Sequence, residues 1–183
     1  MMKKLILVIA LFVSCVTTNS QTVTTEQINR AFNMTLSSDA RTVQEGINLL
    51  LRYAKGGETT CMWNLARFFY EKGEYKDAAY WYKIFYETSN DLQFKGFACI
   101  ELGKIYSGDA YLQYCDEYGV LTGEVRDAHG TITANRMIEV NLEEALMWYN
   151  RAQTLGRDVG SEIAHVEDEI KKGEKKKLEK LKI

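Results

Sequence analysis

Proline is absent from the 183 residues of this chain. A proline inside a helix removes a backbone donor and clashes with the preceding turn, so helix interiors exclude it. Its complete absence fits a chain built mostly of helices. Hydrophobic residues make up 46% of the sequence, which is enough for a buried core and argues against a disordered chain. We expect one domain of ordinary size.

The chain also has no excess of basic residues. The chain has 23 lysines and arginines against 25 acidic residues, for a net charge of -2. Proteins that bind nucleic acid need a basic face, so the sequence predicts no nucleic-acid partner.

Catalytic motifs are scarce as well, because the sequence has only two histidines, His129 and His165. Cys115, Asp116 and His129 lie close together in the sequence but match no metal-ligand spacing. A Cys115–His129 nucleophile pair would lack an orienting third group. There is no glycine-rich phosphate loop or dinucleotide turn. We therefore expect no enzyme, no catalytic residue, no metal and no cofactor.

The N-terminus predicts a signal peptide over residues 1–20. Lys3 and Lys4 precede a ten-residue apolar run from Leu5 to Ser14, which is too short to span a bilayer but suits a signal-peptide core. A buried N-terminal helix or strand is the alternative, and the charged flank argues against it.

Two fates of this segment stay open. Cleavage near Ser20 would leave Gln21 as the first residue, and we favour this outcome. The letters FVSC instead resemble a bacterial lipobox, in which Cys15 would be lipidated, although Phe12 stands where leucine is usual. Either fate exports the protein, to the periplasm, to the medium or to the outer membrane as a lipoprotein, and the lipid would be its only membrane contact.

Three cysteines follow the signal peptide, so at least one is unpaired within the monomer. Cys61 and Cys99 fall in predicted helices, and Cys115 lies further along. A buried thiol acts as a small hydrophobe, and we favour free thiols over a Cys61–Cys99 bridge.

Two short patterns occur twice in the chain. The pattern Ala-x-x-Trp-Tyr recurs 67 residues apart, and a Leu-small-x-x-aromatic pattern recurs 37 residues apart. Because both patterns recur in the same order, they indicate a pair of helices that is repeated in tandem, with an insertion at about 109–140. The matched positions are Ala78, Trp81, Tyr82 with Ala145, Trp148, Tyr149, and Leu65, Ala66, Phe69 with Leu102, Gly103, Tyr106.

Local chemistry supports these helices. Thr60 is the expected N-cap of the first one and Gly73 its stop. Asn141 and Glu144 form a capping-box-like pair at the start of the last one, which Gly156 should end.

The second copy resembles the Sel1-like repeats, relatives of the tetratricopeptide repeats. The first copy departs from the pattern, with Ala66 for glycine and Phe85 where a small residue is usual. The residues that carry the resemblance are Leu102, Gly103, Tyr106, Gly108, Ala145, Trp148, Tyr149, Ala152 and Gly156.

The resemblance implies an all-α fold, an α-solenoid of stacked antiparallel helical hairpins, that serves as a protein-binding scaffold without catalytic residues. Two such pairs would occupy residues 58–160. Residues 21–57 would form a linker and a capping helix at about 39–54, whose partner is either lost or lies in TEQINRAFN. Residues 161–183 would form a closing helix with an apolar stripe and a charged end.

The insertion offers a possible β-hairpin between 120–126 and 131–137, with an irregular loop as the equal alternative. Long insertions are often functional, so its side chains join the candidates for a binding surface. Tyr80 and Lys83 lie off the apolar stripe and are expected on an exposed face. The candidate binding residues are Tyr80, Lys83, Tyr114, Tyr118 and His129.

The expected function is therefore an exported scaffold that binds a protein or peptide in the bacterial cell envelope. One alternative is an enzyme of the β-lactamase or penicillin-binding type, which some cysteine-rich Sel1-like proteins resemble; those carry a regular cysteine pair in each repeat, and this chain lacks it. Another is a structural, oligomeric envelope component.

Overall fold

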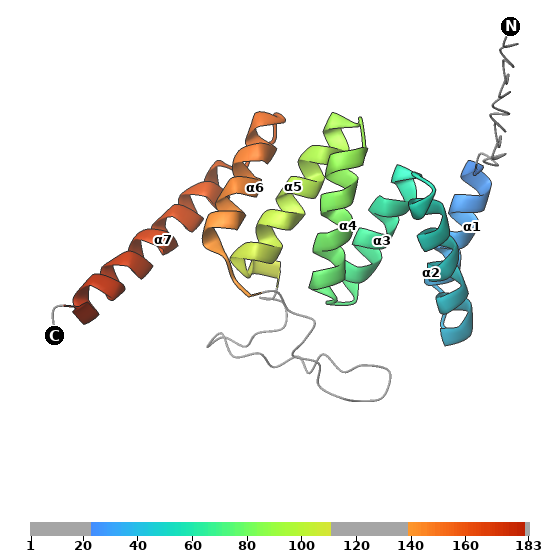
Figure 1. Ribbon diagram of the computed structural model, residues 1–183, viewed down its shortest axis with the longest axis horizontal. Coiled ribbons are helices and arrows are strands. Elements are labelled where there is room, and N and C mark those ends of the chain that lie inside the picture. The colour runs from blue at the N-terminus through green and yellow to red at the C-terminus, as the bar shows by residue number, and fades with distance from the viewer. Residues whose placement is uncertain (1–22, 111–138, 182–183) are drawn as a thin grey trace, which may run out of the picture.

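The computed structural model describes residues 23–110 and 139–181, with side chains as far as residue 176. Over these residues the chain forms seven helices and no strand, which confirms the all-α prediction there (Figure 1). The two halves of the expected β-hairpin lie outside the described residues. The helices are α1 (Thr25–Thr35), α2 (Ala40–Lys55), α3 (Thr59–Glu71), α4 (Tyr75–Thr88), α5 (Leu92–Ser107), α6 (Leu142–Thr154) and α7 (Gly160–Leu181).

Polar side chains cap the helix starts. Asp39 accepts a hydrogen bond from the Thr42 backbone N–H at 2.8 Å and so fixes the start of α2. Asn141 does the same for α6, accepting from the Glu144 N–H at 3.0 Å, as the sequence predicts.

The start of α3 differs from the prediction. Glu58, rather than Thr60, is the N-cap, and its carboxylate accepts from the Thr60 N–H at 3.2 Å. The reason is the preceding turn, in which Gly57 has a φ of 95° and leaves Glu58 extended. The expected stops are present, because Gly73 and Gly156 follow α3 and α6 with φ of 68° and 78°.

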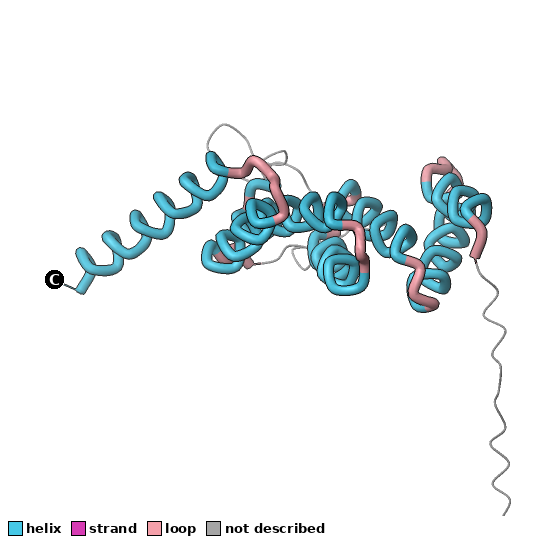
Figure 2. Tube along the Cα trace, turned by 90° about the horizontal axis from the view of Figure 1, so that it is seen from above, coloured by secondary structure: helices cyan, strands magenta, loops and turns pink. Residues whose placement is uncertain are grey.

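The helices pack as consecutive pairs. α1 lies against α2, α3 against α4 and α5 against α6, and α7 covers α6. The pairs follow one another in a row, with α1 and α2 at one end and α7 projecting from the other (Figures 1 and 2). The partner of α2 is thus α1, which contains the segment TEQINRAFN.

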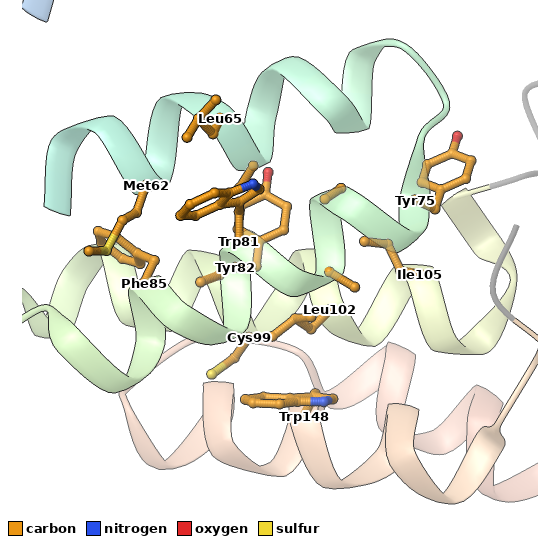
Figure 3. Close-up of a cluster of buried hydrophobic side chains, with 14 of the residues drawn as sticks. Met62, Leu65, Tyr75, Trp81, Tyr82, Phe85, Cys99, Leu102, Ile105 and Trp148 are labelled. Carbon is orange, nitrogen blue, oxygen red and sulfur yellow. The ribbon is translucent and has the colours of Figure 1, made fainter. Parts of the chain in front are cut away.

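The two tryptophans of the repeated pattern occupy matching places in the core. Trp81 of α4 lies beside Met62 and Leu65 of α3, and Trp148 of α6 lies beside Cys99 and Leu102 of α5 (Figure 3). Met62 and Cys99 are 37 residues apart, as are Leu65 and Leu102. The repeat seen in the sequence is therefore also a repeat of packing.

One glycine in α5 permits the close approach of α6. A Cβ atom at Gly103 would lie 2.5 Å from Cε1 of Tyr149, which is buried completely. The small residue and the large ring therefore fit together, which is the small-large alternation expected of paired helices.

The C-terminal helix α7 begins at Gly160, close to the expected 161. Val166 is buried against the core, and Ile163 and Ile170 pack beside it, so the predicted stripe is present. Lys172 pairs with Asp168 at 2.7 Å on the solvent side. None of the helices in the described parts of the chain combines the length and the apolar character needed to cross a membrane.

Candidate functional site

Of the predicted binding residues, the structure describes Tyr80 and Lys83, which both lie on α4. Tyr80 of α4 is 56% exposed, as expected, and its ring meets the edge of Trp81 at 5.2 Å. Tyr114, Tyr118 and His129, together with Cys15, lie outside the described residues.

Lys83, which is expected on an exposed face, is partly exposed and also makes contacts with other helices. Its ammonium donates to the Tyr106 hydroxyl and to the Glu144 carboxylate, both at 2.7 Å. Burial lowers the pKa of Lys83, but the hydrogen bonds with Glu144 and Tyr106 outweigh it and leave the pKa above its ordinary value. The Lys83 side chain therefore links α4 to α5 and to α6.

The described residues contain a hollow lined by aromatic rings, which we call the aromatic pocket. It has a volume of about 300 Å³ and lies between α3 and α5, with α4 contributing one ring. The lining residues are Trp63, Arg67, Tyr70 and Glu71 of α3, Tyr82 of α4, and Phe97 and Glu101 of α5.

Helical spacing brings this lining together. Trp63, Arg67 and Tyr70 are separated by four and three residues and so lie on one face of α3, and Phe97 and Glu101 share a face of α5 in the same way. Tyr82 comes from α4, which packs between those two helices.

Trp63 is the centre of the aromatic contacts. Its ring lies 5.5 Å from Tyr82, 5.3 Å from Phe85 and 5.1 Å from Phe94, all in tilted or edge-to-face geometry. Such pairs hold each other in place beyond the effect of area burial. Trp63 is itself half-buried, and Phe94 is 41% exposed, so this cluster continues to the surface.

Arg157, which follows α6, fixes the rim on the α5 side. Its guanidinium lies 3.9 Å from the centre of the Phe97 ring and donates to the Gln93 carbonyl at 2.6 Å. Gly96 makes room for it, because a Cβ there would lie 2.6 Å from Arg157 Nε.

The charges around the aromatic pocket are mixed. Arg67 pairs with Glu71 at 3.3 Å on α3. Burial, followed by the nearby Glu101 carboxylate, raises the pKa of Tyr70 and of Tyr82 far above the ordinary value. Both phenols therefore remain protonated at neutral pH.

A larger hollow of about 860 Å³ lies between the start of α6 and α7. Its lining is acidic and carries one aromatic ring, that of Tyr106, whose hydroxyl already accepts from Lys83. The carboxylates are those of Glu139, Glu143, Glu144, Glu169 and Glu174. The aromatic pocket is the better candidate for recognition, because exposed aromatic rings are typical of binding hot spots.

The thiols do not contribute a reactive group. Cys61 and Cys99 are buried and free, so the alternative of a bridge between them is wrong. Burial raises the pKa of Cys61 to about 12 and that of Cys99 to about 11, which keeps both protonated at neutral pH. In residues 23–110 and 139–181 no cluster of three or more acidic, histidine or cysteine side chains is arranged to hold a metal.

Sequence reasoning missed Trp63 and Phe97 as surface residues. Trp63 stands next to Met62 of the apolar stripe, and its ring contacts Phe94 of α5. The available signal was the Trp63–Arg67–Tyr70 spacing, which puts two large rings and a cation on one face of a helix.

No protein-family model, curated protein or solved structure matches this chain.

Proposed function

We propose that this chain is an exported Sel1-like scaffold that binds an extended segment of a partner protein across α3 and α5. The repeat interpretation is supported by the matching surroundings of Trp81 and Trp148. The nine residues that resemble the Sel1-like pattern lie in α5, in α6 or directly after these helices. Stacked helical pairs of this kind offer extended binding surfaces.

The observation that carries the proposal is the aromatic surface around Trp63. Phe94 and Phe97 are 41% and 39% exposed, and they contact one another with ring centres 6.2 Å apart. Large exposed apolar side chains that cluster mark interaction sites more often than isolated ones do. This cluster opens directly onto the aromatic pocket, of which Phe97 is part.

The packing of these rings favours tight recognition. Trp63 is held by three neighbouring rings, and Phe97 by the Arg157 guanidinium. Side chains that are already fixed lose little conformational entropy when a partner binds. The binding energy would therefore come from covering the rings of Trp63, Phe94 and Phe97, with the charged residues around them setting orientation.

The test compares affinities for one partner. A protein captured from envelope extract by the full chain is identified and purified, and its affinity is measured for the wild type, Trp63→Ala, Phe94→Ala and Met147→Ala. Met147 of α6 is 39% exposed and so matches Phe94 (41%) in exposure. Thermal melting of each variant shows that it is folded.

We expect Trp63→Ala and Phe94→Ala each to weaken binding by about tenfold, as for residues at the centre of an interface. Met147→Ala should change the affinity by less than about twofold. Equal losses at Phe94 and Met147, or no loss at Trp63 and Phe94, would place the partner elsewhere. A stable oligomer that forms without any partner, through the same rings, would favour the structural envelope component.

A further inference from the structure

The aromatic pocket combines rings with acidic side chains. Four of its seven lining residues are Trp63, Tyr70, Tyr82 and Phe97, and two others are glutamates. A purely apolar partner side chain needs no carboxylate beside it, and burying one next to it would cost solvation energy. A cation gains from both kinds of neighbour, because ring faces and carboxylates are each negative.

The rings meet at steep angles. Trp63 and Tyr82 are inclined by 68°, with their centres 5.5 Å apart, and Tyr70 and Tyr82 by 73°, with their centres 6.4 Å apart. In such edge-to-face pairs the edge of one ring lies against the face of the other, so only the ring faces that stay uncovered can receive a cation.

The α5 side of the aromatic pocket carries one carboxylate, that of Glu101. Arg67, the only cation in the described lining, is matched by Glu71 one turn further along α3. Glu101 faces the aromatic pocket from α5, and its side chain is 25% exposed. Lys104 pairs with it at 3.1 Å across one turn of α5, and the Lys104 side chain is 39% exposed, so solvent partly screens this pair.

The chain itself places a cation on one of these rings. The Arg157 guanidinium lies 3.9 Å from the centre of Phe97, at the edge of the aromatic pocket. Phe97 is still 39% exposed beside it. The volume of about 300 Å³ lies at the lower end of the range for ligand pockets, which suits one side chain.

Resting on the proposed function, we propose that the aromatic pocket takes the cationic side chain of a lysine or arginine of the bound segment, between the Trp63, Tyr70 and Phe97 rings and the Glu101 carboxylate.

The test uses single-residue probes and the full chain labelled with ¹⁵N. The probes are N-acetylarginine amide, its neutral isostere N-acetylcitrulline amide, and N-acetylnorleucine amide, which has an apolar side chain. The readout is the indole N–H signal of Trp63, assigned by comparison with Trp63→Phe. The indoles of the other two tryptophans, Trp81 and Trp148, are buried and serve as internal controls.

We expect the arginine probe to shift the Trp63 signal in a saturable way at millimolar concentration and to bind at least about threefold more tightly than citrulline. Glu101→Gln should weaken arginine binding by about threefold, and Lys104→Met should tighten it by about twofold, because it removes a competing cation. These opposite directions separate an electrostatic role of Glu101 from a loss of folding.

Equal binding of arginine and citrulline, or stronger binding of norleucine, would overturn the cation assignment while leaving a peptide-binding aromatic surface in place. Unchanged arginine affinity in both Glu101→Gln and Lys104→Met would overturn it as well. If the arginine probe binds as expected but a captured partner is insensitive to Trp63→Ala and Phe94→Ala, the proposed function fails and the cation site stands.

Discussion

The Lys83 ammonium lies 2.7 Å from the Glu144 carboxylate, although the two residues are 61 positions apart in the sequence. Their side chains are 36% and 26% exposed, so solvent screens the pair only in part. The contact joins α4 to α6 across the end of α5, where Tyr106 also accepts from Lys83 at 2.7 Å. It is a polar link between consecutive helical pairs.

Replacing Lys83 by methionine should lower the free energy of unfolding by about 0.5–1 kcal/mol, because a partly exposed pair with two hydrogen bonds is lost. Lys76→Met, at an exposed position of the same helix, is the control and should change stability by less than about 0.5 kcal/mol. Urea denaturation measures both. An equal effect of the two substitutions would show that the contact of Lys83 with Glu144 and Tyr106 adds nothing to the free energy of unfolding.

Close packing of the Tyr149 ring should require glycine at position 103. Gly103→Ala gains about 1 kcal/mol of helix propensity but forces apart two buried groups, and we expect a net loss of about 1–2 kcal/mol. Gly173→Ala in α7 is the matched control, because nothing lies within 4 Å of a Cβ there, and it should be neutral or stabilising. Thermal unfolding compares them, and a stabilising Gly103→Ala would contradict the close packing.

Stability should fall as the pH rises above about 9. Burial raises the pKa of Cys61 from 9.0 to about 12 and that of Cys99 from 9.0 to about 11. The folded chain therefore keeps two protons that the unfolded chain loses, so the free energy of unfolding decreases with pH in this range. Each thiol contributes at most about 1.4 kcal/mol per pH unit.

Denaturation at pH 7.5, 9 and 10 under reducing conditions measures this slope. The double variant Cys61→Ala/Cys99→Ala should show a flatter decrease between pH 9 and 10, whatever its stability at neutral pH. An unchanged slope would mean that the two thiols ionise as freely in the folded chain as in the unfolded one.

The N-terminus predicts a defined mature protein. If the chain is exported and cleaved after Ser20, the intact mass of the protein from the producing cell corresponds to a first residue of Gln21. Mass spectrometry of the mature N-terminus distinguishes this from a lipidated Cys15. A mass that includes residues 1–20 would contradict export through this segment.

Much of the fold follows from local chemistry that the sequence displays. The span 39–54 predicts α2 closely, because Asp39 caps it and its apolar residues keep helical spacing. Asn141 and Gly156 mark the two ends of α6 in the same way. The spacing of 37 and 67 residues between matched positions predicts equivalent packing of Trp81 and Trp148, since each tryptophan then meets residues at matching positions of the neighbouring helix.

The candidate site was harder to predict because it depends on contacts between distant helices. Lys83 lies off the apolar stripe and is expected on an exposed face, but the sequence does not show that it meets Glu144. Trp63 adjoins the apolar stripe of α3, and its place in the sequence does not show that it is only half-buried. Its partial exposure depends on where α5 places Phe94 and Phe97, which is set by tertiary packing rather than by local pattern.

Site-specific photo-crosslinking tests the central claim, that a partner binds over α3 and α5, most directly. A benzophenone amino acid is placed at Phe94 or at Met147, whose exposures of 41% and 39% are nearly equal, and the full chain is irradiated in the cells that produce it. The account predicts one discrete crosslinked partner from position 94 that is lost with Trp63→Ala, and none from position 147. The same adduct from both positions, or an adduct from position 147 alone, would contradict it.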